Sequence, residues 1–397
     1  MSDHKHPHSL KDLVLYFMKL GATGFGGPVA LIGYMHRDLV ADLKWYTEEE
    51  YKEGLTLAQL APGPLASQLG TYLAYLHYGY LGATLASVAF LLPSFAMVVA
   101  LGIAYKVFNG LPWMQAAFYG VGGAVVGIIA ISTYRLTTKS IGDLTAASLR
   151  SKWLLWVFFL TTFVLTFISQ AQVLWVFVGA GLLYMFLKSP PDWFRRSGAR
   201  ANALWLIASA GFWRWDTKVL RQMAVFFAKA GGFVFGSGLA IIPFLHATVT
   251  DYHWINEKTF LDAVAVAMIT PGPVLITVAF IGYLTQGFPG ALVSAFCVFL
   301  PTFLMTLIVA PYFKRIAQNR SIKSFVEGIT AAVIGAIAGS VVTIGYKTFA
   351  PDRVHIDPVP VVMAIVTVLS LLFIKKMREP YIILAAAAVG IIVRYML

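Results

Sequence analysis

Charged residues are absent from two long stretches of the chain, from Gly54 to Tyr105 and from Ala263 to Phe313. Three shorter uncharged stretches lie at 107–134, 153–187 and 230–250. A helix that crosses a bilayer needs about 20 apolar residues, and each long stretch is more than twice that length. A β-barrel would instead show short segments of alternating hydrophobicity. The pattern therefore predicts an all-α, polytopic membrane protein.

Breaks in these stretches divide each half of the chain into six apolar segments. In the first half the segments lie near residues 13–35, 54–78, 79–105, 112–134, 153–169 and 171–187. In the second half they lie near residues 222–246, 261–285, 288–313, 325–347, 359–374 and 380–396. The last two segments of each half are short, which favours a tight hairpin, and we expect about 10–13 membrane segments in total.

The two halves carry the same motifs in the same order, which indicates two homologous repeats. The matched pairs are Lys19 with Lys229, Trp45 with Trp254, Glu53 with Asp262, Pro62-Gly63-Pro64 with Pro271-Gly272-Pro273, Leu92-Pro93 with Leu300-Pro301, and Gly127 with Gly335. The offset between partners falls only from 210 to 208 along the way. We therefore predict an N-terminal repeat over 1–187, a basic linker over 188–221 and a C-terminal repeat over 222–397.

Composition supports a membrane protein and changes how the charge is interpreted. Hydrophobic types make up 59% of the chain and charged types 12%, against about 45–50% and about 25% in ordinary soluble domains. This excludes a soluble enzyme. The net charge of +12 does not indicate nucleic-acid binding, because Lys and Arg collect in the cytoplasmic loops of membrane proteins. The single cysteine, Cys297, excludes an internal disulfide and a cysteine metal cluster.

The distribution of Lys and Arg predicts how the repeats are oriented. Basic clusters lie at 135–152, 188–221, 314–323 and 375–378. If all twelve segments crossed the membrane, these clusters would face both sides, against the positive-inside rule. One change of direction between the halves places all four in the cytoplasm, so we expect inverted repeats. The change could come from re-entrance of the glycine-broken segments 13–35 and 222–246, or from an extra passage by Ala201–Trp213.

The two Pro-Gly-Pro motifs interrupt the longest uncharged stretches. Proline lacks an N–H group and clashes with the preceding turn, so each motif should end one helix, and its second proline suits the first position of the next. The half-helix that follows presents free N–H donors and partial positive charge at membrane depth. We expect an anion site there, with Gln59, Gln68 and Thr270 nearby; a kink that serves only packing is the alternative.

Glycine-rich runs form a second pair of breaks, at Gly24-Phe25-Gly26-Gly27-Pro28 and at Gly231-Gly232-Phe233-Val234-Phe235-Gly236-Ser237-Gly238. Successive N–H groups in such a run can converge on one anion, although small residues also permit close helix packing. Lys19 and Lys229 precede the runs, where an ionisable side chain is a functional candidate or a lysine that extends to the interface. We include both runs and both lysines in the expected substrate-binding site.

Acidic candidates are fewer. Glu53 and Asp262 lie nine residues before each Pro-Gly-Pro motif and are candidates for proton coupling; the alternative is an acid at a helix start, where it favours the dipole. Thr47-x-x-Glu50 predicts a capping box, and we expect His36 and His246 to be solvated. Patterns such as HExxH, GxSxG and the P-loop do not occur, so we expect no catalytic residue, no metal and no cofactor, and not an enzyme.

Several motifs together resemble the chromate ion transporter family, in its long two-domain form. They are FGGPVALIGYMHRDLV, LAQLAPGPLASQLGTYLAYLHYGYLGA and FLLPSF in the first half, and FGSGLAIIPFL, AMITPGPVLITVAFIGYLTQGFPGA and FLPTF in the second. The resemblance covers nearly the whole chain. It implies an inner-membrane carrier that expels chromate, with sulfate as the related anion, uses the proton gradient and confers chromate resistance.

The matching positions are Gly24–Pro28, Pro62–Pro64, Gly236–Gly238 and Pro271–Pro273. In the second half, Ser237 replaces Gly27, and Gly238, followed by Leu239, stands where Pro28 would match, so we expect unequal half-sites.

The expected function is therefore a secondary active exporter of a tetrahedral oxyanion. Transport of sulfate or another anion in either direction is an alternative, and so is a membrane-embedded enzyme acting on a lipid phosphate. The expected partners are chromate or a sulfate-like oxyanion, protons and the lipid bilayer, with no nucleic acid, and a homodimer is compatible with the sequence.

Overall fold

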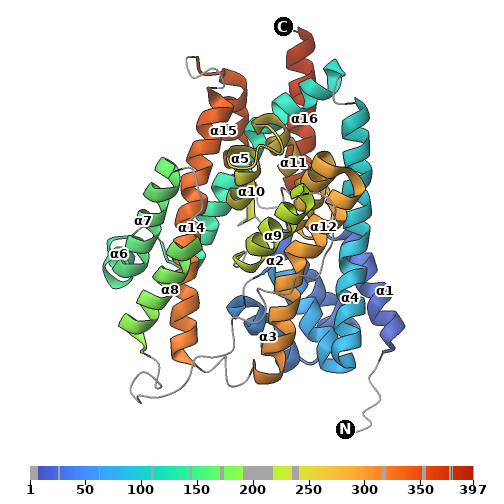
Figure 1. Ribbon diagram of the computed structural model, residues 1–397, viewed down its shortest axis with the longest axis vertical. Coiled ribbons are helices and arrows are strands. Elements are labelled where there is room, and N and C mark those ends of the chain that lie inside the picture. The colour runs from blue at the N-terminus through green and yellow to red at the C-terminus, as the bar shows by residue number, and fades with distance from the viewer. Residues whose placement is uncertain are drawn as a thin grey trace.

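The computed structural model describes residues 8–25, 27–61, 63–108, 111–143, 145–169, 174–190, 218–234, 241–313, 319–350, 355–374, 377 and 379–396. All regular structure in these residues is helical (Figure 1). Four helical stretches among them are long and apolar enough to cross a membrane: Leu65–Phe108, Pro112–Ser140, Val274–Tyr312 and Arg320–Phe349. Shorter apolar helices accompany them, at Trp153–Ser169, Trp175–Lys188 and Pro358–Phe373. The prediction of an all-α membrane protein is confirmed.

Both halves of the chain contain matching series of helices, apart from a short helix at Ala146–Ser151 that has no counterpart among the described helices of the second half. The first half holds α1 (Leu10–Thr23), α2 (Gly27–Met35) with a π-helical extension (His36–Asp42), α3 (Glu48–Leu60), α4 (Leu65–Phe108), α5 (Pro112–Ser140), α6 (Ala146–Ser151), α7 (Trp153–Ser169) and α8 (Leu174–Lys188). The second half holds α9 (Lys218–Gly232), α10 (Ile242–Thr250), α11 (Glu257–Ile269), α12 (Thr277–Val309), α14 (Arg320–Phe349), α15 (Pro358–Phe373) and α16 (Glu379–Met396). Short 3₁₀ turns at Val274–Ile276 and Ala310–Tyr312 flank α12.

Glycine turns α4 and α12 into helical hairpins. A straight helix of 44 residues, the length of α4, would extend about 66 Å, twice the roughly 30 Å of hydrocarbon. Gly79 (φ 59°, ψ −150°) bends α4, and Gly287 (φ 65°, ψ −152°) bends α12. Beside the second bend the two limbs touch, because a Cβ on Gly282 would overlap the carbonyl oxygen of Gly290. The sequence segmentation near these two glycines is thus confirmed.

The repeats exchange helices rather than folding side by side. Within each repeat the first helix packs on the hairpin, α1 on α4 and α9 on α12. The later helices cross over: α7 and α8 of the first repeat pack against α14, while α15 and α16 pack against α5 (Figure 1). Glycines permit the close approach, since a Cβ on Gly123 of α5 would overlap the carbonyl oxygen of Pro360. Neither half therefore completes its own packing.

The equivalent helices α5 and α14 contact each other in opposite directions. Gly122 faces Thr348, and Val126 lies opposite Gly345, so residue numbers rise along one helix as they fall along the other. Both helices are long enough to span a bilayer, and in Figure 1 α3 lies low in the view while its equivalent α11 lies high. The repeats are therefore inverted, as predicted. The segment Ala201–Trp213, one proposed source of the inversion, lies outside the described residues.

The hairpin bends give a test of backbone strain that is free of steric clash. Among the described residues, no other group lies within 4 Å of a Cβ added at Gly79 or at Gly33, but only Gly79 of the two has a positive φ. We expect Gly79→Ala to destabilise the protein by about 1–3 kcal/mol, whereas Gly33→Ala, inside α2, stabilises it by up to about 1 kcal/mol. Thermal unfolding of the detergent-purified variants measures the difference, and equal melting temperatures would contradict it.

Candidate functional site

Both Pro-Gly-Pro motifs break the helix, as predicted. α3 ends at Leu60 and α11 at Ile269, and the central glycines Gly63 and Gly272 have φ values of +137° and +99°. The position of the second proline differs from the expectation. The carbonyl of Pro64 accepts a hydrogen bond from Gln68 N–H at 3.1 Å, so this proline precedes the first residue of α4 and caps it instead of starting it. Pro273 likewise precedes the 3₁₀ turn that leads into α12.

Each break is hydrogen-bonded to the glycine-rich segment of the other repeat. Gly272 N–H donates to the carbonyl oxygen of Gly24 at 2.8 Å, and Gly63 N–H donates to that of Val234. Gly63 and Gly272 are repeat partners, and so are Gly24 and Val234 at the offset of 210. The two bonds are therefore the same interaction made twice across a pseudo-two-fold axis.

A third motif joins this contact from the long limb of each hairpin. Ser94, in the sequence FLLPSF, donates to the carbonyl of Gly21 at 3.1 Å, and its partner Thr302, in FLPTF, donates to Gly231 at 3.4 Å. The same side chains pack on the opposite breaks, because a Cβ on Gly272 would overlap Ser94 Oγ. Three motifs that are far apart in sequence thus meet at two equivalent points.

A cavity of about 600 Å³, here called the central cavity, lies against these contacts. It is lined by Gly24, Gly27, Thr56, Gln59, Leu60, Leu65, Ile128, Ser132, Arg135, Leu136, Lys139, Ser140, Ala267, Met268, Thr270, Gly272, Val274, Lys323, Val326, Glu327, Thr330 and Glu379. Four of these residues begin helical segments: Gly27 begins α2, Leu65 begins α4, Val274 begins the turn before α12 and Glu379 begins α16. Helix N-termini carry free N–H donors and partial positive charge.

Basic side chains complete the central cavity, and sequence reasoning missed their role. Arg135 and Lys139 come from α5 and Lys323 from the first turn of α14. The positive-inside rule accounted for them as loop charges. A better signal was their spacing: Arg135 is the first charge after the uncharged stretch, and Lys139 lies one turn further on the same helical face. The cavity lining also contains two acids, Glu327 and Glu379. Glu327 is paired with Lys188 at 2.8 Å.

The other predicted residues have different positions. Lys19 and Lys229 are exposed on α1 and α9 and do not line the central cavity. Phe25 is half-buried and Pro28 falls in the first turn of α2, while five residues are buried without lining the cavity: Gly63, Pro64, Gln68, Pro271 and Pro273. The predicted residues outside the described part of the chain are Gly26, Pro62, Gly236, Ser237 and Gly238.

The two carboxylates lie inside helices rather than at helix starts, contrary to the alternative from the sequence. Asp262 is 2% exposed and accepts a hydrogen bond from the Tyr105 hydroxyl at 2.6 Å. Glu53 is half-buried and accepts one from Tyr72 at 3.3 Å. Neither carboxylate lines the central cavity. Asp262 instead lines a separate cavity of about 610 Å³, here called the second cavity.

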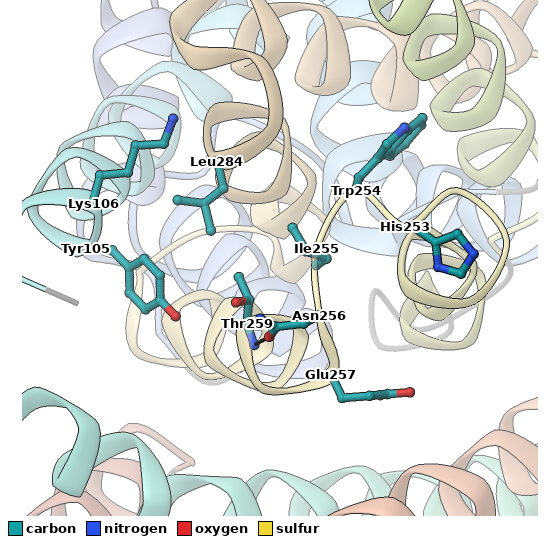
Figure 2. A pocket seen from close by; sticks show the side chains of 9 residues that line it. All are labelled: Tyr105, Lys106, His253, Trp254, Ile255, Asn256, Glu257, Thr259 and Leu284. Atoms are coloured by element: carbon teal, nitrogen blue, oxygen red, sulfur yellow. Dashed lines mark hydrogen bonds between the residues drawn. The ribbon is translucent and has the colours of Figure 1, made fainter. Parts of the chain in front are cut away.

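Tyr105 connects Asp262 to a hollow at the N-terminal end of α11. This hollow, of about 720 Å³, is lined by Tyr105, Lys106, His253, Trp254, Ile255, Asn256, Glu257, Thr259 and Leu284. Figure 2 shows Tyr105 on α4 with its hydroxyl directed toward the start of α11, where Asn256 caps the helix. The hollow and the second cavity share Glu257.

The ends of α3 and α11 are held by equivalent histidine–glutamate pairs. Thr47 and Glu50 form the predicted capping box of α3. His36 lies 2.8 Å from Glu48, and this hydrogen bond lowers the pKa of the exposed Glu48 carboxyl. His246 lies 3.0 Å from Glu257 but is 4% exposed. The expectation of two solvated histidines therefore holds for His36 and is wrong for His246, because α11 covers it.

Comparison with known proteins gives a consistent result. The family model described as "Chromate transporter" matches residues 11–185 and 221–391. A "Chromate transport protein" of Cupriavidus metallidurans is 53% identical over 395 residues, which cover 98% of this chain and 95% of the relative. A "Probable chromate transport protein" of Synechococcus elongatus is 51% identical, with 98% and 97% covered. An uncharacterized transporter of Methanocaldococcus jannaschii is 28% identical, with 99% and 96% covered. No solved structure matches.

The central cavity predicts which lysines contribute to anion affinity. We expect Lys323→Gln to weaken sulfate binding about tenfold, which is about 1.4 kcal/mol, because it removes one of three basic groups on the cavity wall. Lys19→Gln removes the same charge from the exposed face of α1 and is the matched control. Titration calorimetry of the detergent-purified variants measures both; equal losses, or none for Lys323→Gln, would contradict this site.

Proposed function

The chain belongs to the chromate transporter family, and from this premise we propose that it is a secondary active transporter that exports chromate across the inner membrane, driven by the proton gradient. The observation that carries the proposal is the central cavity, which is lined by the first residues of four helical segments and by three basic side chains between inverted repeats. Inverted repeats with discontinuous helices are a common design for secondary transporters, with the substrate bound at the repeat interface.

The lining of the central cavity fits a tetrahedral oxyanion with two negative charges. Backbone N–H groups at helix starts bind oxyanions without a charged side chain. Arg135, Lys139 and Lys323 add long-range attraction, and the pairing of Glu327 with Lys188 reduces the opposing charge. Chromate and sulfate share shape and charge, so the same lining serves both, and sulfate is the alternative cargo.

The positions of the basic residues support export as the direction of transport. Arg135, Lys139 and Lys323 belong to clusters that the positive-inside rule places in the cytoplasm. A cavity with these residues at its wall therefore takes its anion from the cytoplasm in this state. Removal of a toxic oxyanion from that side would confer chromate resistance.

Asp262 is the group best placed to couple transport to protons. An ionised carboxylate held away from water is costly unless it is paired or hydrogen-bonded, and this one accepts a hydrogen bond from the neutral Tyr105 hydroxyl. A bound proton neutralises the charge without any other partner. Glu53, the equivalent acid, is half-buried and gains less from protonation, so we assign the coupling to Asp262 first.

The direct test is uptake of radiolabelled chromate into inverted vesicles that contain the protein. We expect accumulation that requires a proton gradient and falls with excess sulfate, because both anions compete for one cavity. Uptake without a gradient would contradict proton coupling. Well-inserted protein that moves sulfate but not chromate would identify sulfate as the cargo.

Replacement of the two acids separates coupling from anion binding. Asp262→Asn keeps the shape of the side chain but cannot exchange a proton, so we expect chromate uptake to lose its dependence on the gradient while sulfate affinity stays unchanged. Glu53→Gln is the repeat-equivalent control and should retain gradient-driven uptake. The slope of uptake rate against the imposed pH difference measures both, and an unchanged slope in Asp262→Asn would exclude this residue.

A further inference from the structure

The second cavity is lined by the repeat partners of residues that line the central cavity. Its α5 and α14 lining includes Gln115, Phe118, Tyr119, Gly122, Lys347 and Thr348. At the offset of 208 their partners are Lys323, Val326, Glu327, Thr330, Lys139 and Ser140, and all six line the central cavity. The two cavities are therefore lined by equivalent surfaces of α5 and α14 and lie at opposite ends of these helices.

The two cavities differ in depth because α11 is packed and α3 is not. α11 packs against α5 and α16, and the second cavity extends along it to Leu261 and Asp262 but not to the break at Gly272. In the described part of the chain α3 makes no comparable contact with α14 or α8. Thr56 and Gln59 of α3 instead face Lys323 and Thr330 across the central cavity, which does reach Gly272.

An ion pair holds α11 in its packed position. Glu257, at the start of α11, pairs with Lys347 near the end of α14 and with His246. Burial opposes ionisation of Glu257, but the bonds from His246 and Lys347 outweigh it and lower the pKa of this carboxyl. Glu257 is therefore ionised at neutral pH.

The equivalent pair in the first repeat is open. The partners of Glu257 and Lys347 are Glu48 and Lys139. Glu48 keeps its histidine, His36, whereas Lys139 forms no ion pair with any described residue and lines the central cavity. One of two chemically equivalent locks is closed and the other is open.

We infer that the second cavity is the other mouth of the oxyanion route, held shut by Glu257–Lys347, and that Glu48–Lys139 shuts the central cavity when the second cavity opens. This inference rests on the proposed function for the nature of the cargo. When the second cavity opens, α11 separates from α5. When the central cavity closes, α3 packs onto α14. Each movement is the reverse of the other, and one repeat makes one while the other repeat makes the other.

The charges of the second cavity suit release rather than capture. Its basic residues Lys258, Lys347 and Arg394 are matched in number by the acids Glu257, Asp262 and Asp357. The central cavity has three basic and two acidic residues, with one acid paired to Lys188. An anion that moves from the central cavity to the second cavity therefore passes from net positive to balanced surroundings.

Cysteine labelling tests the two mouths without any transported substrate. In a Cys297→Ala background, Ser140→Cys and Thr348→Cys are repeat-equivalent probes of the two cavities. We expect a membrane-impermeant maleimide to label Ser140→Cys from the cytoplasmic side only and Thr348→Cys from the opposite side only. Labelling of both from one side would overturn the inference, whatever anion the protein carries.

Two cross-links in the Cys297→Ala background test whether the two cavities open alternately. Gly122 of α5 lies against Leu261 of α11, because a Cβ on Gly122 would lie 3.7 Å from Leu261 Cδ1, so a short, reducible bis-thiosulfonate reagent can join a Gly122→Cys/Leu261→Cys pair and fix α11 on α5. We expect this cross-link to lower chromate uptake at least tenfold, its reduction to restore uptake, and sulfate binding to remain. Unchanged uptake in the fully cross-linked protein would overturn the inference.

The matched pair Glu48→Cys/Lys139→Cys reports the opposite state. We expect its disulfide to form only as α3 closes, and to be blocked when the Gly122–Leu261 cross-link is already present. Equal formation with and without that cross-link would show that the two locks are independent and would overturn the inference. Absence of chromate uptake in every reduced variant, with labelling and cross-linking as expected, would instead refute chromate as the cargo.

Discussion

Two backbone hydrogen bonds exchanged between the repeats support the rest of the structure. A helix broken inside a membrane leaves peptide groups that lipid cannot satisfy, so protein must supply their partners. Here the break in each repeat is bonded to the glycine-rich segment of the other, through Gly272 to Gly24 and Gly63 to Val234. The hairpin limbs pack against the same points through Ser94 and Thr302. The breaks can therefore stay open toward a cavity while their backbone remains anchored.

The chemistry of short motifs could be predicted from the sequence, but their meeting points could not. Proline and glycine act locally, so the breaks, the capping box at Thr47 and the duplication followed from residue type and spacing. The bond from Gly272 to Gly24 joins groups some 250 residues apart, and no local pattern specifies it. The positions of Arg135 and Lys139 were not predicted for a related reason. The positive-inside rule explained both as loop charges, so nothing in the sequence analysis placed them on a cavity wall.

Duplication has been followed by specialisation of the two halves. The Tyr72 ring is tilted against Phe313, and at the equivalent contact Tyr105 meets Phe280 edge to face. Both tyrosines belong to α4, and each donates a hydrogen bond to one of the two carboxylates, Tyr72 to Glu53 and Tyr105 to Asp262. The tyrosine and the phenylalanine have therefore changed places between the two equivalent contacts. At the offset of 208 the repeat partner of Arg135 is Thr343. The first repeat therefore has a guanidinium at this position and the second does not. Such differences allow one mouth to favour capture and the other release without loss of the shared backbone.

The exchange of α7 and α8 for α15 and α16 also sets a condition on how the protein is made. α5 is complete at Ser140, but the helices that cover it end only at Met396, about 250 residues later. At roughly 5–20 residues per second, synthesis of that length takes roughly 10–50 s. During this interval α5 waits in the membrane with its glycine-containing face uncovered. Biogenesis therefore depends on whatever shields this helix until α15 and α16 arrive.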